Sequence, residues 1–135
     1  MAEYSRMIEA KIKDKNLGED VIIAPYIENE DLPAVYNLAE TLVYPSLLEG
    51  FGLPIIEAMK CGVPVIASDI PALAEVAGGA AALMNPRDAK QLADKIFEVL
   101  ENQKLRSELI ASGLERSKIF SWRKTAEEMF KILCV

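Results

Sequence analysis

The 135-residue sequence predicts an α/β domain with a parallel sheet of about four strands, flanked by helices and followed by a helical C-terminal tail. Strand-like apolar runs alternate with helix-like patterns from residue 21 to about residue 100, which is typical of βαβ units. Hydrophobic residues make up 51% of the chain, enough for a core and too many for a disordered protein. The length fits a single domain, for which ~100–200 residues is usual.

The first half is expected to hold two helices and two strands. Apolar residues at helical spacing predict the first helix, which Asn16-Leu17-Gly18 ends with glycine after the last turn. Val21–Ala24 is a short apolar run typical of a strand buried on both faces. The elements are then a helix over 2–16, a strand over 21–24 stopped by Pro25, a helix capped by Asn29 or Asp31 with Pro33 in its first turn, and a strand over 41–44.

The second half begins with a loop that contains two glycines and leads into a helix over 54–60, which ends at Cys61-Gly62. Ser68 or Asp69 is expected to cap a short helix that reaches Val76 and is closed by glycines. The remaining elements are strands over 63–67 and 81–84 and helices over roughly 88–101, 102–116 and 122–134, the last capped by Ser121.

Composition narrows the function classes. Fifteen basic residues against 21 acidic ones give a net charge of −6, the opposite of a protein that grips nucleic acid. The chain has no histidine, which excludes histidine-based acid–base catalysis and the common zinc sites. No apolar stretch reaches the ~18 residues of a membrane span. We expect a cytoplasmic protein in which Cys61 and Cys134 are free thiols, although a disulfide between them is possible.

The loop between the strand over 41–44 and the following helix holds the candidate functional residues. Gly50 and Gly52 let a ligand approach bare backbone N–H groups, and the helix start adds partial positive charge. Glu49 precedes the glycines and Glu57 lies in the helix, where both carboxylates can accept hydrogen bonds from hydroxyls. Ser46 lies on the same rim. This combination suits a nucleotide sugar, which carries a diphosphate and many hydroxyls.

Each of these residues also has a purely structural explanation. Glu57 can simply complement the helix dipole, worth about 0.3–1 kcal/mol. The glycines can form an ordinary tight turn that a buried Phe51 anchors, with Ser46 as a turn residue. The dipole explanation covers Glu57 but gives no reason for Glu49 or the glycines.

The same residues resemble a known family, the group 1 retaining glycosyltransferases of the GT-B fold, built from two Rossmann-like domains. The resemblance runs through nearly the whole chain and is strongest in two motifs. These are Pro45, Ser46, Glu49, Gly50, Phe51, Gly52, Leu53, Pro54, Glu57, Ala58 and Met59, followed by Cys61, Gly62, Pro64, Val65, Ile66, Ala67 and Ser68.

The resemblance implies a role for each site residue. Glu49, the catalytic candidate, would contact hydroxyls of the donor sugar, and Glu57 the ribose hydroxyls. Backbone N–H groups of Gly50, Phe51, Gly52 and Leu53 would hold sugar and diphosphate, and Tyr26 would flank the nucleobase. Family members retain anomeric configuration and use a nucleotide-diphosphate sugar as substrate, with no metal and no cofactor.

By the same resemblance, residues 1–135 form one partial Rossmann-like donor-binding domain, without the acceptor domain and the first two donor-domain strands. The expected strands correspond to 3, 4, 5 and 6 of a 3-2-1-4-5-6 sheet. Either 21–24 pairs directly with 41–44, or another chain fills the gap. An unpaired parallel edge favours association, so we expect a homodimer through this edge.

Three functions remain open at this stage. The leading one is the donor-binding part of a nucleotide-sugar glycosyltransferase, inactive alone because most of the ~8 kcal/mol or more of barrier lowering needs groups it lacks. The second is a non-catalytic nucleotide-sugar-binding or assembly module. The third, a nucleotide-sugar epimerase fragment, matches the motif over 45–59 less well.

Overall fold

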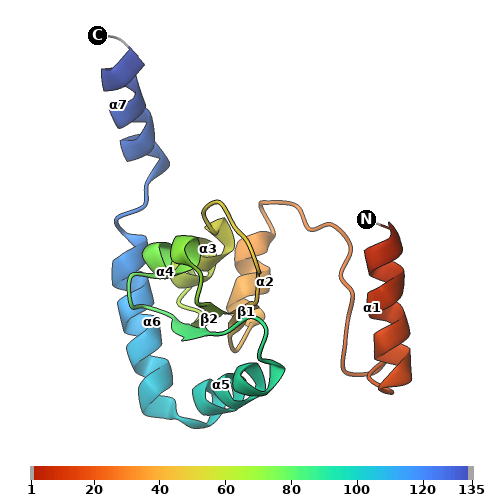
Figure 1. The fold of residues 1–135 in the computed structure, drawn as a ribbon. Coiled ribbons are helices and arrows are strands. Elements are labelled where there is room, and N and C mark those ends of the chain that lie inside the picture. The colour runs from red at the N-terminus through yellow and green to blue at the C-terminus, as the bar shows by residue number, and fades with distance from the viewer. Residues whose placement is uncertain (1, 134–135) are drawn as a thin grey trace.

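The computed structural model describes residues 2–133, with side chains from residue 5 onward. Seven helices and three strands occur in this part of the chain (Figure 1). In order they are α1 (Ala2–Asp14), α2 (Leu32–Leu38), β1 (Leu42–Tyr44), α3 (Leu53–Lys60), β2 (Val65–Ser68), α4 (Pro71–Ala77), β3 (Ala82–Met84), α5 (Ala89–Glu101), α6 (Gln103–Ser117) and α7 (Trp122–Leu133).

The three strands form one parallel sheet in the order β1-β2-β3, which confirms the predicted fold class. Leu42 pairs with Val65 at one side of β2, and Ile66 pairs with Ala82 at the other. All four residues of β2 are buried. A central strand covered on both faces explains why its sequence is an unbroken apolar run rather than an alternating one.

Successive residues of β2 serve the two faces of the sheet, as the strand period of two requires. Val65 and Ala67 join the core cluster under α3 and α4, whereas Ile66 packs with residues of β3, α5 and α6. Figure 1 shows α3 and α4 above the sheet and α5 below it. Helix α6 contacts both α3 and α5, and the two layers therefore share a border.

The close packing of α6 on α3 depends on a glycine. Gly113 is buried, and an added Cβ there would lie 3.1 Å from Cγ of Met59. Because glycine has no side chain, the backbone of α6 approaches α3 closely at this point.

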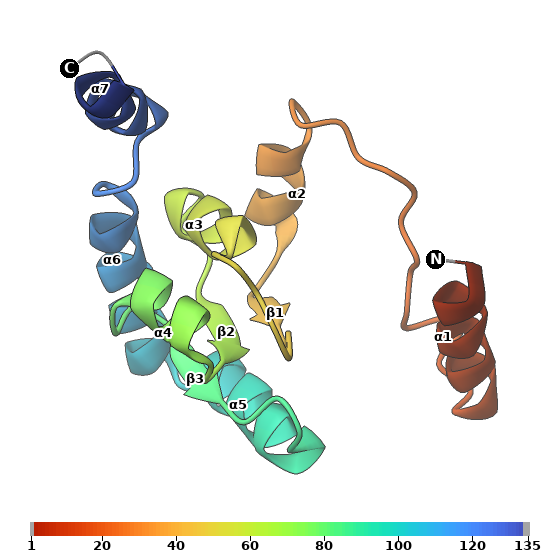
Figure 2. The same cartoon turned by 45° about the horizontal axis from the view of Figure 1, so that its top comes forward.

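The strand predicted over 21–24 is wrong. This segment is extended but unpaired, and Ile22 is 88% exposed. Both views show α1 and the chain that follows it standing apart from β1 (Figures 1 and 2). A strand requires a hydrogen-bonded neighbour, and none lies beside this run within residues 2–133. Direct pairing with β1, the first of the two alternatives above, is therefore excluded by the structure.

Two predicted helix ends also differ. The first helix stops at Asp14, and the left-handed residue beyond it is Asn16 (φ 55°) rather than Gly18. Asparagine tolerates this conformation better than most residues. The N-cap of α4 is Ile70, and neither Ser68 nor Asp69 caps the helix, because Ser68 is still part of buried β2.

The C-terminal tail is helical, as predicted. Helix α7 extends away from the sheet beyond α6 and has no buried residue among those described (Figure 1). Ser121 precedes it, as expected for its cap, and accepts a 3.5 Å hydrogen bond from the Lys124 N–H. The thiol of Cys61 is free, whereas Cys134 lies outside the described residues.

Arg116 of α6 ties the end of α4 to the rest of the molecule. Its guanidinium donates to the carbonyls of Val76 (2.9 Å) and Glu75 (2.5 Å). It also lies over the ring of Phe120, 5.3 Å from the centroid. The last carbonyls of a helix carry partial negative charge, so a cation here satisfies them and stabilises the helix end.

Replacing Arg116 tests how much its contacts with α4 stabilise the fold. We expect Arg116→Met to lower the free energy of unfolding by about 1–3 kcal/mol, because two carbonyls lose a charged donor. Urea unfolding followed by circular dichroism measures the change. The matched control is Arg123→Met on exposed α7, where only an i,i+4 pair with Glu127 is lost and stability should barely change. Equal effects of the two substitutions would contradict the tie.

Candidate functional site

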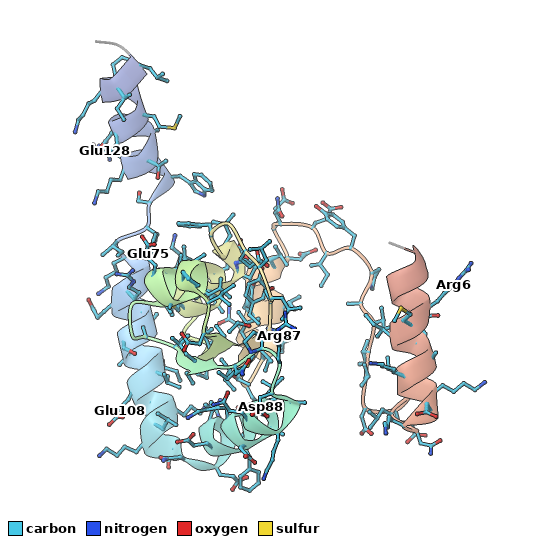
Figure 3. All side chains as sticks on the ribbon, viewed as in Figure 1. Arg6, Glu75, Arg87, Asp88, Glu108 and Glu128 are labelled. Carbon is cyan, nitrogen blue, oxygen red and sulfur yellow. The ribbon has the colours of Figure 1, made fainter. Side chains whose placement is uncertain are left out.

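The candidate site is the loop over residues 45–52, which connects the carboxyl end of β1 to the start of α3. Ligands of open parallel sheets bind at this edge. Three charged side chains far from this loop, Arg6, Glu108 and Glu128, project outward from α1, α6 and α7 (Figure 3).

Glu49 is held by two donors on one of its oxygens. The Tyr44 hydroxyl donates to Oε1 at 2.6 Å, and the Ser46 hydroxyl donates to the same atom at 2.8 Å. These bonds, that of Tyr44 first, lower the pKa of the Glu49 carboxyl below its ordinary value. Glu49 is therefore ionised at neutral pH, with Oε2 left without a donor among the described residues.

Glu57 is the fifth residue of α3 and faces α2. The hydroxyl of Tyr36 donates to its Oε2 at 2.9 Å. Burial, followed by this hydrogen bond to a carboxylate, raises the pKa of Tyr36 well above its ordinary value. The phenol therefore keeps its proton and stays a donor, while nothing in the described chain donates to Glu57 Oε1.

The two glycines of the loop have different roles. Gly52 is buried with φ 106° and ψ 50°, and an added Cβ would lie 2.6 Å from Cδ2 of Leu73. Only glycine fits there, as the tight-turn explanation requires. Gly50 is exposed, and a Cβ added to it would meet nothing within 4 Å. The turn therefore explains why residue 52 is glycine. It does not explain Gly50, where a side chain would have room.

Phe51 is not the buried anchor considered above, because 47% of its surface is exposed. Its ring makes an edge-to-face contact with Phe120, with centroids 5.9 Å apart. The guanidinium of Arg116 in α6 lies over the Phe120 ring, so this ring contact links the loop to α6. Next to the loop lies an apolar cavity of about 400 Å³. Phe51, Leu53 and Phe120 line it, together with Trp122 and Met129 of α7.

Backbone donors line the loop. Within the described chain, no N–H of residues 50–53 donates an internal hydrogen bond; the first helix bond nearby runs from Ile55 N–H to the Gly52 carbonyl. Unsatisfied N–H groups at a helix start form an anion-binding arrangement. The structure thus places Ser46, Glu49 and residues 50–52 in this loop, whereas Leu53 begins α3 and Glu57 lies within α3, hydrogen-bonded to Tyr36 of α2.

Tyr26 is not brought into contact with the loop. It lies in the extended segment between α1 and α2, 79% exposed, and its proposed role next to a nucleobase stays a prediction.

The sequence analysis did not identify two residues that contact the candidate carboxylates. Tyr36 and Tyr44 both act on the candidate carboxylates, yet they are 21 and 5 positions from their partners. The only available signal was that Tyr44 is the last residue of a strand leading into the loop. No local pattern indicated Tyr36.

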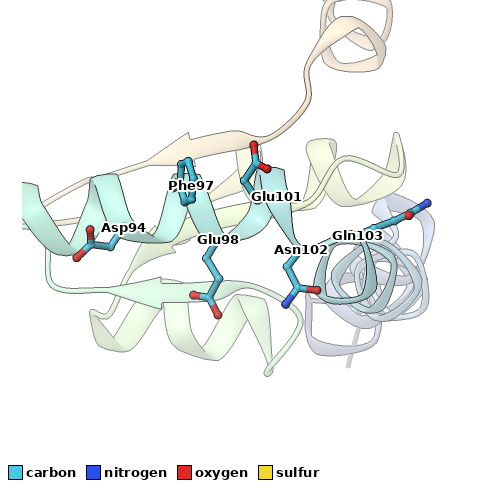
Figure 4. Close-up of a pocket in the computed structure, with 6 residues that line it drawn as sticks. All are labelled: Asp94, Phe97, Glu98, Glu101, Asn102 and Gln103. Carbon is cyan, nitrogen blue, oxygen red and sulfur yellow. The ribbon is translucent and has the colours of Figure 1, made fainter.

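A second hollow, of about 590 Å³, lies over α5 and its junction with α6, lined by Asp94, Phe97, Glu98, Glu101, Asn102 and Gln103. Figure 4 shows Phe97 and Glu101 pointing to one side of the helix and Asp94 and Glu98 to the other. These side chains do not converge on one point. This hollow is not the candidate site.

Residues 2–116 match the protein family described as glycosyl transferases group 1. The chain belongs to this family. It is 46% identical over 97 residues to the O-antigen chain mannosyltransferase B of Escherichia coli, covering 72% of this chain and 26% of that protein. The chain thus spans about a quarter of this relative's length.

Solved structures give the same result and confirm the resemblance to the C-terminal part of these GT-B enzymes. A sucrose-phosphate synthase from Thermosynechococcus elongatus matches with a TM-score of 0.88 and 36% identity, over 95% of this chain and 33% of that one. The C-terminal domain of a group 1 glycosyl transferase from Francisella tularensis matches with a TM-score of 0.76 and 28% identity, over 87% and 62%. Within residues 2–133, every helix is too short or too polar to cross a membrane.

The hydrogen bonds on Glu49 predict its titration. Because its pKa is lowered in the folded chain, Glu49 stabilises the fold above its unfolded pKa, and this contribution is lost as the pH falls through the folded value. Carboxyl ¹³C NMR should show Glu49 titrating below the ordinary ~4.3 of glutamate. Tyr44→Phe should raise its pKa, and Ser46→Ala should raise it less. Ordinary titration in all three proteins would contradict the geometry.

Proposed function

We propose that this chain is the donor-binding part of a nucleotide-sugar-dependent glycosyltransferase. The observation that carries the proposal is the pair Glu49, in the loop, and Glu57, in α3, separated along the chain by four N–H groups that make no hydrogen bond within the described residues; each carboxylate keeps one oxygen without a partner among the described residues. Family membership and the mannosyltransferase names of the relatives support sugar transfer.

In this proposal the N–H groups of residues 50–53 and the start of α3 hold the diphosphate. They are needed because the chain carries a net charge of −6 and its overall field does not favour an anion. Local dipoles act over a few ångströms and can bind the ligand despite that field. The same groups would stabilise the departing diphosphate during transfer.

The two carboxylates bind the hydroxyls on either side of the diphosphate. Glu57 accepts from the ribose and Glu49 from the donor sugar, as the resemblance to retaining enzymes implies. Retention of the anomeric configuration belongs to the same proposal. Ser46 acts on this site through its hydrogen bond to Glu49.

The acceptor site belongs to protein outside these 135 residues. The mannosyltransferase relative is about four times as long as the matched segment, and 26% of it is covered. We therefore expect the isolated chain to bind donor but to transfer sugar negligibly. A non-catalytic nucleotide-sugar-binding or assembly module would show the same inactivity, and a lack of donor binding would favour the assembly role.

The outer edge of β1 carries backbone groups that pair with no strand within the described residues. The edge faces the side on which α1 and the 21–24 segment stand apart (Figure 2). Exposed Val21, Ile22 and Ile23 lie along that segment. Strands from the rest of the protein or from a second copy would pair with β1 and cover these side chains.

Titration calorimetry with UDP-, GDP- and ADP-sugars tests donor binding. We expect one of them to bind and Glu57→Gln to weaken it about tenfold or more, because hydrogen bonds to a carboxylate are worth about 1.5–3 kcal/mol. The control is Glu115→Gln, an exposed acid of α6 paired with Lys118, which should not change the affinity. Failure of all three donors to bind would leave only an assembly role.

Sedimentation at tens of micromolar tests the open edge. The isolated chain should self-associate, and Ile22→Lys, a change at an 88% exposed side chain, should reduce association without unfolding the protein. Phe97→Lys, also exposed but on α5, should leave association unchanged. A clean monomer at this concentration would refute a homodimer through β1.

A further inference from the structure

We infer that Tyr36 and Tyr44 are positioning residues, each dedicated to one carboxylate and therefore to one part of the donor. Tyr36 aims Glu57 at the ribose, and Tyr44 aims Glu49 at the sugar. This inference rests on the proposed function and adds to it the division of donor recognition between two separate hydrogen bonds.

The first observation is that each tyrosine donates to only one oxygen of its carboxylate and leaves the other oxygen without a donor. Tyr44 and Ser46 both donate to Oε1 of Glu49, so Oε2 remains for a ligand. Tyr36 donates to Oε2 of Glu57, so Oε1 remains. In each carboxylate, protein donors occupy one oxygen only. A carboxylate oxygen used by no internal donor can accept a ligand hydroxyl without first losing a bond.

The second observation is that the tyrosines are themselves fixed by the core. Tyr36 in α2 and Tyr44 at the end of β1 are half-buried and pack against the core cluster that includes residues of α3 and α4. Their hydroxyls are thus presented from elements outside the loop. Burial, mainly for Tyr36, and hydrogen bonding to a carboxylate, mainly for Tyr44, raise the pKa of both phenols, so each stays protonated and remains a donor at neutral pH.

Positioning matters because a glutamate on a loop or helix surface has several rotatable bonds. An unheld carboxylate must be ordered when ligand binds, and the side-chain entropy lost in that ordering weakens binding. A tyrosine bond imposes that order beforehand. Because the two bonds share no atom and lie on different elements, their loss should act independently.

The experiment crosses two variants with three ligands. Affinities are measured by calorimetry for a nucleoside diphosphate, its 2′,3′-dideoxy analogue and the corresponding nucleotide sugar, all with the base that binds best. The ratio of the first to the second reports ribose recognition. The ratio of the third to the first reports sugar recognition. Thermal unfolding of each variant shows whether it is folded.

We expect Tyr36→Phe to reduce the ribose ratio about three- to tenfold and leave the sugar ratio unchanged, as for one lost hydrogen bond. Tyr44→Phe should do the reverse, with a smaller loss because Ser46 still donates to Glu49. Each variant is the control for the other. If Tyr36→Phe fails to fold, Tyr36→Met, which fills the same space flexibly, gives the ribose ratio.

Three results would contradict the inference, and they can be told apart. Reduction of both ratios by both variants would show a general structural role and overturn the inference. Unchanged ratios in both would overturn it equally, while leaving the donor site in place. If the wild-type chain binds none of the three ligands, the proposed function fails first and the inference with it.

Discussion

The left-handed turn at Gly52 is the constraint on which the site depends. The chain must pass from a parallel strand to a helix that packs back on the sheet, and the turn lies directly against Leu73 of α4. Since φ is 106° and no Cβ fits, glycine fixes where α3 begins. The start of α3 places Glu57 one turn inside the helix and leaves Glu49 before the turn. Both carboxylates and the free N–H groups between them follow from this one conformation.

Around that turn, the proposed recognition would depend on dipoles and oriented carboxylates rather than on positive side chains. Lys60 is exposed at the far end of α3, and Arg116 is engaged with the carbonyls of α4. An anion at the loop would therefore be held by the main chain. Main-chain donors have a fixed direction and contribute no net charge, which suits a protein with an acidic surface. In the same proposal the acids would select for hydroxyls, because a carboxylate oxygen accepts hydrogen bonds.

Most of the sheet could be predicted from the sequence because each paired strand is a short, mostly apolar run followed by proline or a polar residue, fully buried in β2 and partly buried in β1 and β3. Val21–Ala24 has the same pattern and is not a strand, since pairing depends on a neighbour that the run itself does not encode. The loop residues could be predicted from spacing along the chain. Tyr36 could not, because its contact with Glu57 joins two helices that the sequence separates by 21 residues. Phe51 appeared suited to burial by size alone, yet its partner Phe120 covers only one edge.

The distribution of burial indicates which part of the described chain stabilises itself. The buried side chains all lie between Ile55 and Ser117, and α2 contributes Tyr36 at the border of that core. Helices α1 and α7 keep apolar residues such as Ile8, Trp122 and Phe130 more than half exposed. Isolated helices of this length are marginal in water, and an apolar face that buries no area adds little free energy. Both helices should therefore open at a lower free energy than the sheet and α3, and packing against further protein would stabilise them. The loop over residues 45–52 leads directly into this buried part of the chain, so its geometry does not require α1 or α7 to be docked.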